Sequence, residues 1–252
     1  MRFLILLSAT LLSMTIPAAS RPDDPGVAVI RRMHDRYAAT WYHTLTFEQK
    51  TTLHAPDGKI TTETWYETSR FPGTLRIDRA PLADANGVFM TADSTFVIEH
   101  GAVSKRNGGG NPLMPLLFDV YVVPVDQSAS TLRAAGYDLS KTHTEMWKGR
   151  RTTVVGADSG DLKTAQFWID TERLVVVRML GPLRPGSPRM LDARFDDYQP
   201  LAGGWISPVC EFYFDGVLRQ REEYSTIKAD PPLDPALFDL AHWTTAKHWA
   251  AH

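Results

Sequence analysis

The chain has 252 residues, and its 27 lysines and arginines against 29 aspartates and glutamates give a net charge of −2 at pH 7. This balance argues against a nucleic-acid partner, because nucleic-acid binding normally requires a strongly basic face. The single cysteine, Cys210, excludes an intrachain disulfide. Its apolar strand-like surroundings predict a buried structural thiol. The length suits one domain with one hydrophobic core.

The first twenty residues have the pattern of a cleavable signal peptide. One positive charge, Arg2, precedes an apolar run from Phe3 to Ile16, and a proline and small residues follow it. The run is shorter than the roughly 20 residues that a membrane-crossing helix needs. We therefore expect residues 1–20 to be removed on export and residues 21–252 to form a single soluble domain.

An amphipathic helix is predicted directly after this segment. Asp24 can cap its N-terminus, and Pro25 suits a first helical turn. Apolar residues then recur at steps of three and four, so that they share one face: Val27, Ile30, Met33, Tyr37 and Trp41. We expect this face to pack against an apolar surface.

From residue 43 onward, apolar and polar residues alternate with the period of two that is typical of strands. Eleven runs fit this pattern: 43–53, 59–69, 75–78, 87–91, 95–99, 151–157, 164–169, 173–180, 189–196, 205–215 and 218–228. Most connections are short enough for hairpins. The sequence thus predicts a mainly β fold of the α+β class, with about eleven antiparallel strands in a large curled sheet or a barrel.

One segment interrupts the β pattern. Residues 112–122 follow three glycines, Gly108–Gly110, and contain almost no polar side chains. A helix that is apolar on every side must be buried, and the concave side of the sheet is the place for it. A second short helix is expected over 128–136, ending at Gly136. We expect the first segment to act as a lid or plug, with the glycines as its hinge.

No catalytic motif stands out. The glycine run lacks the residues of a phosphate-binding loop, and no nucleophile elbow is present. His248 and His252 have the spacing of helix-borne metal ligands, but no carboxylate completes the set, so surface polar residues explain them better. The sequence predicts a protein that is not an enzyme and that uses no metal and no cofactor.

Several strands carry large apolar residues on both faces, as in Phe167 beside Trp168. Two interpretations fit this pattern. One is a thick core in a two-layer domain. The other is an apolar cavity for a lipid-like ligand, since ligand sites are concave and mostly apolar.

The order of these features resembles the LolA-like group, which includes periplasmic lipoprotein carriers and outer-membrane lipoprotein-sorting proteins. The resemblance covers most of the chain after the signal and depends on pattern rather than on one diagnostic motif. The segments that carry it are Phe47–Gln49, Arg70–Asp78, Pro112–Val122, Phe167–Asp170, Val175–Arg178 and Leu233–Phe238. One departure is that Phe71 separates Arg70 from Pro72, whereas the carrier arginine of the group directly precedes proline.

This resemblance implies an incomplete antiparallel β-barrel whose helices cover an apolar cavity for acyl chains. It implies a periplasmic location and an acylated lipoprotein or lipid as cargo. Carriers of the group receive lipoproteins from an inner-membrane ABC transporter and pass them to an outer-membrane receptor. We expect a monomer with these partners.

The predicted cavity and lid residues are Phe47, Trp65, Leu75, Leu113, Leu116, Leu117, Phe118, Trp168, Phe212 and Phe214. Arg70 and Arg76 are predicted rim charges that could pair with the polar end of a cargo. The alternative is that both are exposed charges at strand ends, of little individual energy.

A non-enzymatic carrier of lipoproteins or lipids for outer-membrane sorting is the leading hypothesis. A lipid-sensing envelope-stress module on the same scaffold is the second. A hydrolase of acylated envelope substrates is the third, and it would need a convergent nucleophile and base that the sequence does not reveal.

Overall fold

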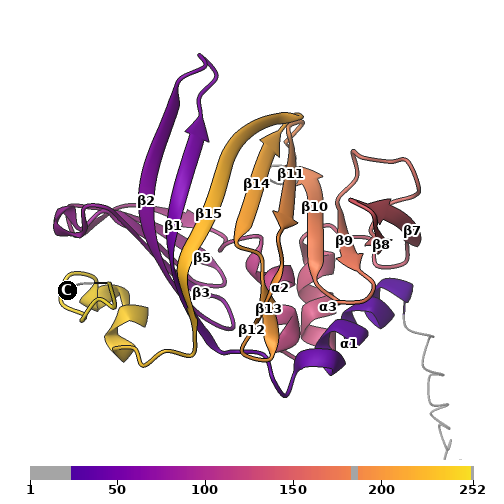
Figure 1. The fold of residues 1–252 in the computed structure, drawn as a ribbon, viewed down its shortest axis with the longest axis horizontal. Helices are drawn as coiled ribbons and strands as arrows, with labels where there is room; N and C mark the ends of the chain where they lie inside the picture. Colours follow the sequence, from indigo (N-terminus) through magenta and orange to yellow (C-terminus); the bar gives the residue numbers. More distant parts are fainter. Residues whose placement is uncertain (1–23, 183–186, 251–252) are drawn as a thin grey trace, which may run out of the picture.

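The computed structural model describes residues 24–182 and 187–250, so the predicted signal peptide lies outside the described residues. Within these residues, no helix is long and apolar enough to cross a membrane. The described residues form one large curved sheet with the α-helices on one side of it (Figure 1).

The sheet has thirteen antiparallel strands in the order β6-β5-β4-β3-β2-β1-β15-β14-β11-β10-β9-β8-β7, and β6 and β7 are its unpaired edges. Its strands are β1 (Thr44–His54), β2 (Ile60–Arg70), β3 (Thr74–Arg79), β4 (Gly87–Met90), β5 (Ser94–Glu99), β6 (Ala102–Gly108), β7 (Thr142–Trp147), β8 (Arg150–Val155), β9 (Gln166–Asp170), β10 (Val176–Pro182), β11 (Met190–Asp196), β14 (Val209–Phe214) and β15 (Val217–Ala229). A separate hairpin joins β12 (Gln199–Leu201) to β13 (Gly204–Ile206). The mainly β fold with an incomplete barrel is confirmed.

The strand count is higher than the eleven runs predicted. The strands β6, β7 and β12 had no prediction, and the run 205–215 divides into β13 and β14. Every residue of β6 is exposed, so that strand lacks the alternation of apolar and polar residues by which strands are recognised in sequence.

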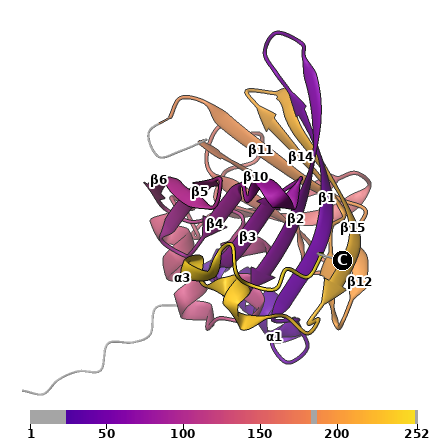
Figure 2. The same cartoon turned by 90° about the vertical axis from the view of Figure 1, so that its left-hand side faces the viewer.

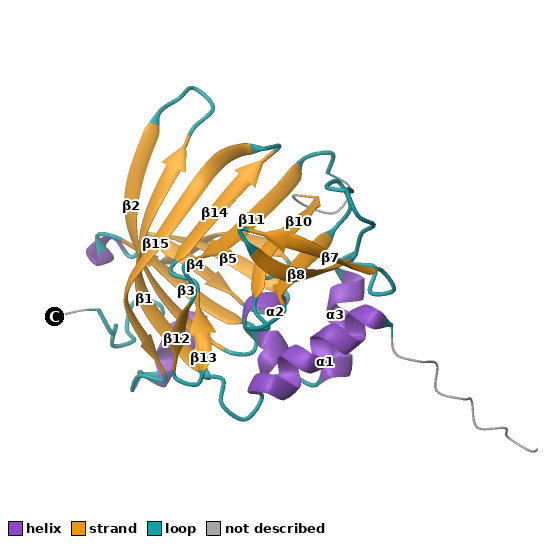
Figure 3. Ribbon diagram, turned by 45° about the vertical axis from the view of Figure 1, so that its right-hand side comes forward, coloured by secondary structure: helices purple, strands orange, loops and turns teal. Residues whose placement is uncertain are grey.

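The N-terminal helix, α1 (Pro25–Tyr37), lies on the concave side of the sheet (Figure 3). Its predicted apolar face is buried, with Ile30 and Met33 fully enclosed in the main core. Asp24 occupies the N-cap position, but its carboxylate accepts a hydrogen bond from Arg133 (2.7 Å) rather than from the helix.

The apolar segment over 112–122 forms two short elements instead of one helix: α2 (Met114–Leu117) and the 3-10 helix η2 (Asp119–Tyr121). The backbone of Phe118, with φ −138° and ψ −55°, leaves the helical region and separates them. The segment does lie on the concave side, in the main core, as predicted.

The third helix, α3 (Val125–Ala134), begins three residues before its predicted start. It ends at the expected glycine. Gly136 has φ +94°, and the N–H of Tyr137 donates to the Leu132 carbonyl (3.1 Å). This is the Schellman arrangement, in which glycine tolerates the left-handed backbone that terminates a helix.

Residues 230–250, after β15, lie on the convex face of the sheet, on the side opposite to the α-helices (Figure 2). They contain two 3-10 helices, η3 (Pro235–Phe238) and η4 (Leu240–His242). The indole of Trp249 donates to the Thr68 hydroxyl (2.7 Å), and His248 Nε2 lies 3.2 Å from Asp78. His248 thus packs against the sheet, whereas the sequence predicted a surface polar residue.

Candidate functional site

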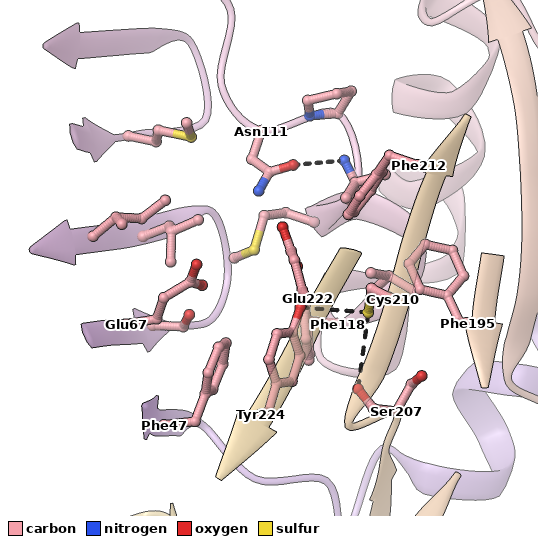
Figure 4. A pocket seen from close by; sticks show the side chains of 18 of the residues that line it. Phe47, Glu67, Asn111, Phe118, Phe195, Ser207, Cys210, Phe212, Glu222 and Tyr224 are labelled. Atoms are coloured by element: carbon pink, nitrogen blue, oxygen red, sulfur yellow. Dashed lines mark hydrogen bonds between the residues drawn. The ribbon is translucent and has the colours of Figure 1, made fainter. Parts of the chain in front are cut away.

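A cavity of about 460 Å³ lies between the concave face of the sheet and the segment that contains α2 (Figure 4). Strands β1, β2, β3, β11, β14 and β15 supply one wall, and residues 110–118 supply much of the other. Its lining is predominantly apolar and aromatic, and its volume is in the range of small-molecule sites. The structure therefore contains the kind of space that the cavity interpretation predicted.

Eight of the ten predicted cavity and lid residues line this space: Phe47, Trp65, Leu75, Leu113, Leu117, Phe118, Phe212 and Phe214. They meet because strand residues two apart share a face. Cross-strand neighbours on β14 and β15 then add to that face.

Leu116 and Trp168 are not among the lining residues. Leu116 is fully buried in the core, on the other side of the short helix α2. Trp168 lies on the opposite face of the sheet, where its ring packs edge-on against Trp147 (centroids 5.6 Å apart) and beside Arg178. Its neighbour Phe167 is the residue that enters the main core.

Arg70 and Arg76 also lie away from the cavity. Leu75 and Ile77 face the cavity, so the alternation of the strand directs Arg76 to the convex face. There Arg76 is 3% exposed and pairs with Asp78. The Arg70 guanidinium stacks over Phe238, 4.5 Å from its ring centre. These positions do not support the predicted role of either arginine at a cavity rim.

The C-terminal half of the lid segment is anchored by aromatic stacking. The rings of Phe71 and Phe118 stack with centroids 4.5 Å apart, and Tyr121 stacks on Trp41 at 3.7 Å. The Gly73 N–H donates to the Asp119 carboxylate (3.1 Å). Phe71 and Gly73 thus hold the segment against the turn between β2 and β3, and Trp41 holds it against the connection between α1 and β1.

The predicted hinge glycines differ in their surroundings. Gly109 has φ +84° and nothing near its Cβ position, whereas a Cβ on Gly110 would lie 2.1 Å from the Thr91 carbonyl oxygen. The absence of a side chain at Gly110 therefore allows the lid to lie close to the β4–β5 turn. Hinge motion itself stays a prediction.

Two buried carboxyl groups in the cavity wall had no sequence prediction. Glu67 follows Trp65 by two residues on β2, and Glu222 precedes Tyr224 by two on β15, so each shares the cavity face of its strand. Both are 8% exposed. Burial raises the pKa of each, and the proximity of Glu222 raises the pKa of Glu67 further. The alternation of strand residues between the two faces of the sheet could have placed both glutamates on the cavity face from the sequence alone.

Cys210 also lines the cavity, between Phe212 on its own strand and Tyr224, whose hydroxyl lies 3.4 Å from the sulfur. The thiol is 3% exposed, and burial raises its pKa well above the ordinary value. A thiol with a raised pKa is a poor nucleophile. The predicted buried structural thiol agrees with this position.

Within the residues that the structure describes, no group of three or more histidine, cysteine, aspartate and glutamate side chains is arranged to hold a metal ion. The acidic pair and Cys210 are therefore polar features of a largely apolar cavity.

No protein-family model matches the chain, and no curated protein sequence matches it significantly. Several solved structures, in contrast, are similar to this chain in fold. A domain described as an outer membrane lipoprotein-sorting protein from Vibrio parahaemolyticus aligns with a TM-score of 0.57 at 12% identity, covering 86% of this chain and 97% of that one. A DUF1329 family protein from Desulfovibrio piger aligns with a TM-score of 0.56 at 13% identity, covering 87% of this chain and 99% of that one.

A LolA superfamily protein from Nitrosomonas europaea aligns with a TM-score of 0.51 at 9% identity, covering 83% of this chain and 96% of that one. At such low identity the likeness concerns the fold and not the activity. The three alignments extend over most of both chains in each pair. This chain therefore has a LolA-like fold.

Proposed function

We propose that this protein binds the acyl chains of lipoproteins or lipids in its apolar cavity and carries them for outer-membrane sorting. It is exported by residues 1–20 and acts in the periplasm, without catalysis. The observation that carries the proposal is the cavity of about 460 Å³ lined by Phe47, Phe212 and other apolar side chains.

The energetics of the cavity support this function. Transfer of apolar groups out of water contributes about 0.8 kcal/mol per methylene, so a chain of several carbons in the cavity is bound without any specific polar contact. The names of two similar structures, a lipoprotein-sorting domain and a LolA superfamily protein, point to cargo of the same kind.

The lid provides the first test. We expect Leu117→Glu to raise the dissociation constant for a neutral apolar dye or a fatty alcohol at least about tenfold, because the new carboxylate must be desolvated at the cavity wall. Leu117 is half-buried and lines the cavity. Fluorescence titration of the dye, followed by competition with the alcohol, measures the change.

Met146→Glu is the matched control, since Met146 is 63% exposed on β7 and lies outside the cavity lining. Binding by this variant should equal that of the wild type. If Leu117→Glu remains folded and binds as tightly as the control, the assignment of this cavity as the acyl site is wrong.

A further inference from the structure

The acidic pair in the cavity wall has no role in the binding of an apolar chain. Glu67 belongs to β2 and Glu222 to β15, and β1 alone separates these strands. Both side chains line the cavity, and Figure 4 shows them entering it from strands on different sides. Two carboxyl groups in an apolar space are costly unless something compensates them.

The two carboxyl groups have different partners. The Tyr224 hydroxyl donates to Glu222 Oε2 (2.6 Å), and Gln220 Nε2 donates to Glu222 Oε1 (2.5 Å). Glu67 is equally buried, at 8% exposure, but no described residue forms a hydrogen bond or ion pair with its carboxyl group. The Glu67 oxygens are not among the fully enclosed side-chain atoms that lack a partner, so they are accessible from the cavity, where a ligand could supply a donor.

The charge of the cavity follows from these contacts. Burial raises the pKa of both groups, and the charge of Glu222 raises the pKa of Glu67 further, while the hydrogen bonds from Tyr224 and Gln220 favour the ionised form of Glu222. Glu222, which accepts two hydrogen bonds, is therefore the better site within the pair for a negative charge. Among the described residues that line the cavity there is no lysine, arginine or histidine to balance this charge.

On the basis of the proposed acyl-chain binding, we infer that the cavity selects ligands whose apolar chain ends in a protonated amine, which Glu67 and Glu222 bind. An ammonium group has three hydrogen-bond donors and no acceptor, which matches a wall that presents carboxyl oxygens. Its positive charge balances the negative charge of the pair, which no cationic side chain of the described lining balances. A carboxylate or phosphate at the same place would meet the charge of Glu222 without any cation nearby.

Three ligands with the same ten-carbon chain test the inference: decylamine, decanol and decanoate, each displacing a neutral apolar dye from the purified protein at pH 7.5. We expect decylamine to displace the dye at a concentration about tenfold or more below that of decanol, since hydrogen bonds to charged groups are stronger than neutral ones. Decanoate should bind most weakly.

Variants then locate the effect. Glu67→Gln and Glu222→Gln should each remove most of the preference for decylamine over decanol. Glu223→Gln is the control, because Glu223 is the neighbour of Glu222 on β15, pairs with Lys50, and does not line the cavity. This control removes one negative charge from the protein and should keep the preference.

The outcomes separate the two proposals. If none of the three ligands displaces the dye, the proposed acyl binding fails. If decanol and decanoate bind as tightly as decylamine, acyl binding stands and the preference for an amine is wrong. A preference that persists in both glutamine variants would also overturn the inference, since it would then arise from the overall charge. The comparison within the wild type requires no variant to fold.

Discussion

Arg76→Met is expected to lower the free energy of unfolding by about 3–5 kcal/mol, the usual cost of removing one partner from a buried ion pair. The Arg76 guanidinium donates two hydrogen bonds to Asp78 (2.7 and 2.8 Å) and one to the Trp243 carbonyl (2.8 Å). It also lies 4.0 Å from the centre of the Trp243 ring. Methionine keeps the aliphatic bulk but leaves the Asp78 carboxylate buried with His248 alone. Urea denaturation at pH 7 measures the loss.

The double variant with Asp78→Asn should recover part of that loss, because it removes the uncompensated charge. Lys50→Met is the control for an exposed pair, since Lys50 and Glu223 are 61% and 41% exposed, and its expected cost is about 0–1 kcal/mol. If Arg76→Met costs no more than Lys50→Met, the buried pair does not secure the C-terminal residues to the sheet.

The sequence could predict the sheet and the N-terminal helix because both show a clear periodicity. The same periodicity contains the information that places Arg76 on the convex face, since Leu75 and Ile77 line the cavity. Periodicity could not predict β6, because the residues of this strand are exposed on both faces. The C-terminal residues 235–250 have no regular pattern, so their position on the convex face depends on tertiary contacts such as that of Trp243 with Arg76.

The cavity was predictable in its apolar part but not in its polar part. The two glutamates are remote in sequence, and only the pairing of β1 with both β2 and β15 brings them into one wall. A single strand pattern can place Glu67 on the cavity face, yet it cannot show that Glu222 lies near it. Register across strands is set by the whole sheet.

Asp119→Asn is expected to make the protein more stable above pH 7 by about 2–3 kcal/mol and to leave stability nearly unchanged at pH 4. Burial raises the pKa of Asp119 to about 6 from an ordinary value of 3.8, and the hydrogen bond from Gly73 offsets only part of this. The folded state therefore holds the proton more tightly than the unfolded state. The stability that Asp119 contributes is complete below about pH 4 and is lost as the pH rises through 6.

Asparagine keeps an oxygen that can accept the Gly73 N–H and cannot ionise, so the variant avoids this loss. Urea denaturation of both proteins between pH 4 and 8 gives the difference in unfolding free energy, in which the titration of other groups cancels. Asp197→Asn, at an exposed residue outside the lid, is the control for the loss of a carboxylate as such. Because Asp119 begins η2 within the lid segment, the ionised carboxylate weakens the segment that covers the cavity. The dye should therefore dissociate faster at pH 8 than at pH 5. A pH-independent difference between Asp119→Asn and the wild type would show that folding does not raise the pKa of this carboxyl group.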